Sequence, residues 1–261
     1  MLNRRILRIK AFKVLFSYAE NQTMELPEAV AALENSCEAT RDLYLLMLNC
    51  IPALTAEAMS RIESAKSKYC PTEQDLNPNM KFVENKIAKI LNEDPDFQKL
   101  VSKKKLSWEQ YDVFMRNLYD SVKSKQYFQD YMASDKSDIK EDAALFVKIC
   151  EEEFVDNADL EMILEDMSIW WNDDLAYSLT WCCRSINDIA AGKPWRLIPL
   201  YQSDIFRAQG KDADSDSVFV KKLLGNALGS YTKNSERVSA SVSKWEMDRL
   251  FTTDLVLISM G

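Results

Sequence analysis

The chain has 261 residues, of which 47% are apolar and 28% are charged, and this composition excludes disordered, collagen-like and disulfide-scaffold proteins. With only five glycines and seven prolines, it lacks the turn residues of a many-stranded sandwich or barrel, so the sequence predicts an all-α fold. It contains no histidine, which excludes Ser-His-Asp and Cys-His nucleophilic sites and histidine-ligated metals.

Cysteine usage and hydropathy indicate the compartment. The six cysteines include no C-x-x-C pair, so we expect reduced thiols that pack as small apolar side chains. The longest apolar stretch, residues 43–54, is broken by Asn49 and Pro52 and is shorter than the roughly 20 residues of a membrane span. No signal peptide opens the sequence, and the expectation is a cytoplasmic protein without a membrane partner.

Positive charge is concentrated in the first 19 residues, which hold five basic residues and no acid, although the net charge of the chain is −8. Wound as a helix over residues 3–19, this segment has one apolar face and an adjacent arc formed by Arg4, Arg5 and Arg8. Guanidinium groups make bidentate contacts with phosphates, and aromatic rings near them stack on the bases of single-stranded RNA. The arc therefore predicts an RNA-binding site, to which Lys10 and Lys13 are added on charge alone.

Two other interpretations of this basic segment stay open. The first is a solvated helix terminus, and the second is ion pairing with the acidic remainder of the chain. Phe12 and Phe16 continue the arginine arc, and core packing explains them better than base stacking does.

A long apolar seam follows, in which residues between 26 and 51 step alternately by four and three positions. This pattern predicts a helix that packs against other helices and that Pro52 interrupts. A further helix is expected over residues 54–68, and the prolines and asparagines of residues 70–80 predict a connection between subdomains.

The later sequence repeats itself loosely. Residues 82–118 recur as residues 219–255 with nine identities in 37 positions, and a fainter third copy contains Phe146 and Trp171. Such self-similarity predicts three related helix-turn-helix units that bury their apolar faces against neighbours. Helical amphipathicity alone, which aligns apolar residues at many offsets, is the other explanation.

Breaks between helices are expected where polar residues, glycine or proline gather. These stretches are residues 131–141, 192–194 and 209–216. The basic run of residues 103–105 precedes Trp108 and predicts a solvated turn.

Catalytic chemistry finds little support in the sequence. Asp173 and Asp174 form a carboxylate pair that could hold magnesium in an α-helical enzyme, but the partner acids of such motifs are missing. Acids at a helix start, stabilised by the helix dipole, explain the pair better. No glycine-rich phosphate loop is present, and the tryptophans are expected to be core anchors. The prediction is a protein without catalytic activity, cofactor or metal.

The two ends of the chain together resemble a known family. Arg4-Arg5, Arg8, Ala11 and Leu15-Phe16-Ser17-Tyr18 resemble the opening of the NusB transcription antitermination family, and residues 218–259 resemble a helix pair of its later part. The resemblance implies a NusB-like helical bundle formed by residues 1–70 and 216–261, with residues 71–215 as a helical insertion. The family has further helices after this point, so the sequence is expected to be a C-terminally incomplete long form.

The resemblance also implies a function. NusB proteins bind boxA-type single-stranded RNA together with NusE, a ribosomal protein, within the transcription elongation complex. Arg4, Arg5 and Arg8 match the family's N-terminal arginine cluster and carry over as RNA contacts. The alternative is a noncatalytic helical-repeat adaptor that binds proteins through its insertion.

Overall fold

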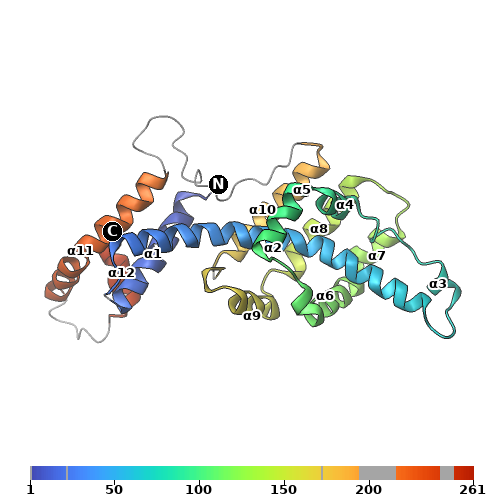
Figure 1. The fold of residues 1–261 in the computed structure, drawn as a ribbon, viewed down its shortest axis with the longest axis horizontal. Helices are drawn as coiled ribbons and strands as arrows, with labels where there is room; N and C mark the ends of the chain where they lie inside the picture. Colours follow the sequence, from blue (N-terminus) through green and yellow to red (C-terminus); the bar gives the residue numbers. More distant parts are fainter. Residues whose placement is uncertain (1, 22, 172, 194–215, 242–249) are drawn as a thin grey trace. The chain divides into compact units, whose positions relative to one another are not determined.

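The computed structural model describes residues 2–21, 23–171, 173–193, 216–241 and 250–261. Within these residues every regular element is a helix and no strand is present (Figure 1). The all-α prediction is therefore confirmed.

Two compact units make up the chain. The first combines Met1–Arg41 with Pro199–Gly261, and the second is Asp42–Ile198. The first thus joins segments from both ends of the sequence, and the second is continuous. The boundary lies inside a helix at residues 41 and 42, whereas the sequence placed the start of the insertion at residue 71.

Unit 1 contains α1 (Arg4–Glu20), the first part of α2 (Leu26–Lys66), α11 (Asp216–Ser241) and α12 (Thr252–Met260). The helix α1 begins where the side chain of Asn3 accepts a hydrogen bond from the N–H of Ile6, as expected of an N-cap. It packs against α11 and α12. Leu7 and Leu15 of α1 are fully buried, as are Val220 of α11 and Val256 of α12.

The helix α2 runs through Pro52 without a break, so the predicted interruption is wrong. Proline removes one helical hydrogen bond, the one to the carbonyl of Leu48. Here the ring is buried within the apolar stretch of residues 43–54, and the hydroxyl of Thr55 donates to the carbonyl of Pro52 at 2.9 Å. Burial of this stretch offsets the lost bond, because tertiary packing supplies most helical stability in proteins.

One described helix is long and apolar enough to cross a membrane by length and composition, and it is α2. Of the 18-residue apolar window of α2 that is long enough for a span, 67% is buried inside the protein. A helix that packs in the core of a protein satisfies the same measure of length and composition.

Unit 2 holds the second part of α2 and a series of shorter helices. They are α3 (Glu73–Leu76), α4 (Lys86–Glu93), α5 (Pro95–Lys104), α6 (Asp112–Ser124), α7 (Gln126–Ala133), α8 (Ile139–Glu153), α9 (Ala158–Met167) and α10 (Leu175–Ala190), with the 3-10 turns η1 (Glu109–Tyr111) and η2 (Ile169–Trp171). Side chains of Asn85, Asp94, Asp138 and Asn157 cap four of these helices. Caps of this kind explain why so many short helices start at defined residues.

The core of unit 2 combines aromatic packing with buried hydrogen bonds. Trp108 is buried, and its indole N–H donates to the carbonyl of Leu46 at 3.0 Å. The hydroxyls of Tyr44 and Ser185 lie 2.7 Å apart in the interior. Trp171 is also buried. The expectation that tryptophans anchor the core is confirmed for Trp108 and Trp171.

The two best-matching copies of the sequence repeat differ in structure. Residues 82–118 form separate elements, from the turn before α4 to the middle of α6, whereas residues 219–241 lie within the single helix α11. Trp245 lies outside the described residues. Over the described residues the two segments therefore differ in helix pattern, which favours amphipathicity as the explanation of their similarity.

The predicted breaks are partly helical. Helix α7 continues to Ala133 and α8 begins at Ile139, so the connection is residues 134–138. Gly192, at φ 66°, follows the end of α10 in the left-handed conformation that glycine adopts readily. The basic run ends α5 with Lys105 at φ 56°, while Lys104 pairs with Asp42 at 3.2 Å. Residues 194 and 209–215 lie outside the described residues.

Candidate functional site

The arginines predicted to bind RNA lie on the outer side of α1. Arg4, Arg5 and Arg8 are all exposed. The guanidinium carbon of Arg4 lies 4.9 Å from the ring centroid of Phe219 in α11, and that of Arg8 lies 5.1 Å from the same centroid. Two arginines one helical turn apart thus each lie over the same aromatic ring.

Phe219 is a member of this surface that the sequence did not reveal. It belongs to α11, and no local pattern links it to α1. A pairing of α1 with α11 would have to be known before the ring could be assigned. We call Arg4, Arg5, Arg8 and Phe219 together the arginine surface of unit 1.

An acidic residue borders the arginine surface. The Nε atom of Arg4 donates to Oδ1 of Asp216, the first residue of α11, at 3.0 Å. One of the two other interpretations, ion pairing with acidic residues, therefore applies to Arg4. Among the described residues, no carboxylate lies within 4.0 Å of the guanidinium of Arg5 or Arg8. Lys222, which is exposed one turn after Phe219, adds positive charge to this side of α11.

The two lysines added on charge alone have different positions. Lys10 has an exposed fraction of 0%, and its Nζ donates to the hydroxyl of Ser36 in α2 at 3.2 Å. It lies three residues after Leu7 and four before Val14, so the helical period turns it into the buried stripe of α1. Lys10 therefore cannot contact RNA in this fold and is removed from the site, while Lys13 is half-buried.

The two phenylalanines of α1 are half-buried. The ring centroids of Phe12 and Phe16 lie 6.2 Å apart with an interplanar angle of 34°. They contact each other and present only part of their surfaces to solvent.

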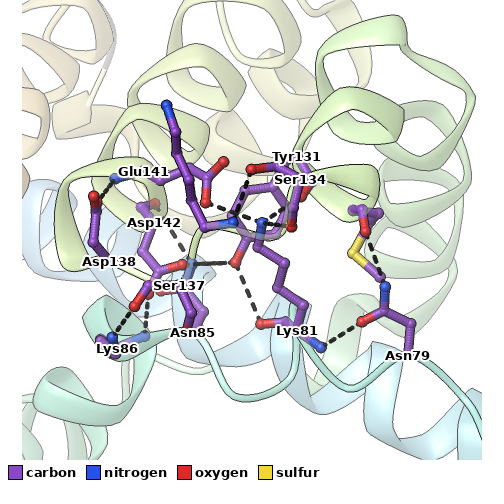
Figure 2. Close-up of polar contacts among 12 residues, drawn as sticks. Asn79, Lys81, Asn85, Lys86, Tyr131, Ser134, Ser137, Asp138, Glu141 and Asp142 are labelled. Atoms are coloured by element: carbon purple, nitrogen blue, oxygen red, sulfur yellow. Dashed lines mark hydrogen bonds and ion pairs between the residues drawn. The ribbon is translucent and has the colours of Figure 1, made fainter.

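A second group of polar residues gathers in unit 2, where the end of α7 and the start of α8 meet the segment before α4 (Figure 2). At its centre lies Lys81. Its Nζ donates to the carbonyls of Tyr131 at 2.6 Å and Ser134 at 2.9 Å, and it pairs with Glu141 at 3.0 Å. The ammonium also lies 4.3 Å from the ring centroid of Tyr131. Lys81 thus ties the connection between α7 and α8 to a segment about 50 residues earlier in the chain.

Asp142 is the buried member of this group. Its Oδ1 accepts from the hydroxyl of Tyr131 at 2.7 Å, and its Oδ2 accepts from the backbone N–H of Lys86 at 2.9 Å. Burial and the nearby Asp142 carboxylate raise the pKa of Tyr131, so the phenol stays protonated and donates. These groups satisfy one another, and the arrangement is one of structural support. The sequence pattern predicts a polar linker over residues 131–141, and it does not predict the attachment of this linker to Lys81.

The two carboxylates considered for metal binding differ in burial. Asp173 is exposed, whereas Asp174 is buried at the start of α10. Among the described residues, no group of three or more Cys, Asp or Glu side chains is arranged to hold a metal ion. The geometry offers no support for the magnesium alternative.

Four thiols belong to the core of unit 2. Cys50, Cys150 and Cys182 are buried and Cys183 is half-buried, and all are free. A hydrogen bond between Cys150 and Cys183 raises the pKa of Cys150 and lowers that of Cys183, and burial raises the pKa of Cys50 and Cys182. The buried thiols are therefore protonated and behave as apolar side chains, as the sequence predicted, whereas Cys70 is exposed and does not pack in the core.

Comparisons with models of protein families, with curated proteins and with solved structures find no match to this chain.

Proposed function

We propose that the chain is a noncatalytic RNA-binding protein that acts as a NusB-like antitermination factor, with the arginine surface of unit 1 as its RNA contact. The observation that carries the proposal is the pair of guanidiniums, Arg4 and Arg8, stacked on the ring of Phe219 beside the exposed Arg5. The resemblance of the first helix to the NusB opening supports the same assignment.

The physical mechanism is electrostatic docking of a phosphate backbone. Arg5 and Arg8 provide planar donor pairs for phosphate oxygens, and the contact of Arg8 with the ring of Phe219 reduces the entropy that its side chain loses on binding. Arg4 exchanges its contact with Asp216 for a phosphate, which lowers the net gain at that position. Sequence preference for boxA-type RNA is completed by NusE, bound within the elongation complex.

The experiment that tests this proposal is a fluorescence-anisotropy titration of a boxA-type RNA and a scrambled RNA, with and without NusE. The variants are an Arg4/Arg5/Arg8→Ala triple and a charge-matched Lys99/Lys123/Lys140→Ala triple whose lysines are exposed in unit 2. We expect the wild type and the unit 2 triple to bind boxA-type RNA alike, and the arginine triple to bind about 100-fold more weakly.

Two outcomes would contradict the proposal. A folded wild-type protein that binds neither RNA, with or without NusE, excludes an RNA-binding function for this chain. Equal losses in the two triple variants would show that only net charge matters and would remove the arginine surface as the site. The protein-adaptor alternative would then be the better account.

A further inference from the structure

A cleft in unit 2 lies outside the proposed RNA surface. It has a volume of about 480 Å³ and opens between the end of α8, helix α9, the turn η2 and the start of α10. Its inner wall is apolar and consists of the buried side chains Phe154, Leu164, Trp171 and Leu179. A volume of this size is in the range of sites that take an organic ligand or an anchoring side chain.

Four carboxylates border the cleft, and all are exposed: Asp156, Glu161, Glu165 and Asp173. They belong to a longer acidic stretch, because residues 149–183 contain ten acidic residues and no lysine or arginine. An apolar wall whose charged border residues, among those that the structure describes, are all acidic selects against RNA and favours a cation that carries an alkyl stem.

Exposed apolar side chains lie on the elements that form the cleft. Val155, which lines the cleft, has an exposed fraction of 53%, Met162 in α9 has 66% and Ile169 in η2 has 74%. A small organic cation would fill the cleft but leave these side chains in water. A protein segment with apolar residues next to its basic residue would cover them as well.

We propose that this cleft binds a lysine or arginine side chain of a partner protein, presented by a segment that also carries apolar residues. The alkyl stem of the basic residue packs on Leu164 and the indole of Trp171, and its charged head lies among the carboxylates of Glu161, Glu165 and Asp173. The neighbouring apolar residues of the segment cover Val155 at the edge of the cleft. This inference does not depend on RNA binding by unit 1.

The first test measures binding of three fluorescein-labelled twelve-residue peptides to the full chain by anisotropy. One alternates arginine with leucine, the second alternates arginine with glycine, and the third alternates glutamate with leucine. The arginine-leucine peptide is expected to bind at least about tenfold more tightly than either of the others. Equal binding of the two arginine peptides would overturn the apolar part of the proposal, and no binding of either would overturn all of it.

The second test locates the site with two pairs of variants. Ala176→Phe fills the cleft from an exposed position of α10, and Thr180→Phe adds the same ring one turn later, at a residue that does not line the cleft. Glu161→Gln/Glu165→Gln removes two charges of the border, and Glu63→Gln/Glu84→Gln removes two exposed charges elsewhere in unit 2.

The first member of each pair is expected to weaken binding of the arginine-leucine peptide about tenfold, and the second to leave it within about twofold. Circular dichroism checks the helical content, and RNA binding by the same variants checks unit 1. If both members of a pair weaken peptide binding equally, the cleft is not the site. If the cleft variants keep peptide binding, the cleft is not the peptide site, whatever happens to their RNA binding.

Discussion

The two units present surfaces of opposite charge and different shape. The arginine surface of unit 1 is built on the outer side of one helix, with a single ring beneath two guanidiniums. The acidic region of unit 2 surrounds a cleft with an apolar wall. The net charge of −8 conceals both, because it sums over surfaces that have different ligands. Local charge together with local concavity is therefore the better guide to partner chemistry.

The largest expected effect is a loss of stability in unit 2 that leaves RNA binding by unit 1 unchanged. Asp142→Ala takes the carboxylate from the hydroxyl of Tyr131 and the N–H of Lys86, and we expect a loss of about 3 kcal/mol in the free energy of unfolding. Urea denaturation measures the loss. RNA affinity of the folded variant is expected to be unchanged.

Asp138→Ala is the control for this prediction. It removes an exposed N-cap of the same helix α8, and it should cost only about 1 kcal/mol. A folded Asp142→Ala protein that no longer binds RNA would show that the two units do not have separate roles.

The next effect is the salt dependence of RNA binding, which tests the positive charge of the arginine surface. If three arginines neutralise three phosphates of a single strand, the logarithm of the RNA association constant falls with the logarithm of salt with a slope of roughly −2. Between about 50 and 200 mM salt, this slope means a loss of roughly 15-fold. Titrations at several salt concentrations measure it. A slope near zero in the wild-type protein would contradict phosphate docking, and a slope unchanged in the Arg4/Arg5/Arg8→Ala variant would place the phosphates elsewhere.

A smaller effect concerns backbone conformation in unit 2. Lys105 ends α5 at φ 56° and ψ 39°, a left-handed conformation that is costly for a residue with a Cβ atom. Lys105→Gly should raise the free energy of unfolding by about 1 kcal/mol. Lys103→Gly, inside the last turn of the same helix, should lower it by about the same amount. Thermal and urea denaturation measure whether each variant is more or less stable than the wild type. A loss of stability in both variants would contradict the left-handed cap.

The smallest expected effect tests the removal of Lys10 from the site. Lys10→Met keeps an unbranched side chain in the buried stripe of α1, and RNA affinity of the folded variant should stay within about twofold of the wild type. Arg8→Met, one turn away on the same helix, should weaken RNA binding about tenfold. Anisotropy measures both, and equal losses would return Lys10 to the interface.

Local patterns predicted what depends on nearby residues. The helical period placed α1 over residues 3–19, and the structure has it at Arg4–Glu20. The same period predicted a seam along residues 26–51, and these residues lie in α2. The exposed arginine arc followed from the same rule. Lys10 was assigned by charge instead of by position, and its place three residues after Leu7 already predicted burial.

Features that depend on distant residues could not be predicted. Nothing near Pro52 indicates that the surrounding unit buries it and keeps α2 continuous. Phe219 joins the arginine surface only because α11 packs on α1. The polar residues 131–141 look like a solvated linker until Lys81 is known to lie against them. In each of these cases, tertiary packing overrides what the local sequence favours.

The arrangement of unit 1 also determines when its surface can form during protein synthesis. The contact between Arg4 and Asp216 spans 212 residues of chain, and all of unit 2 is translated in between. At about 5–20 residues per second, a ribosome needs roughly 10–40 s for that distance. During this interval α1 has neither Phe219 nor α11 beside it. The proposed RNA surface is therefore completed late in synthesis, after the chain of unit 2 has been made.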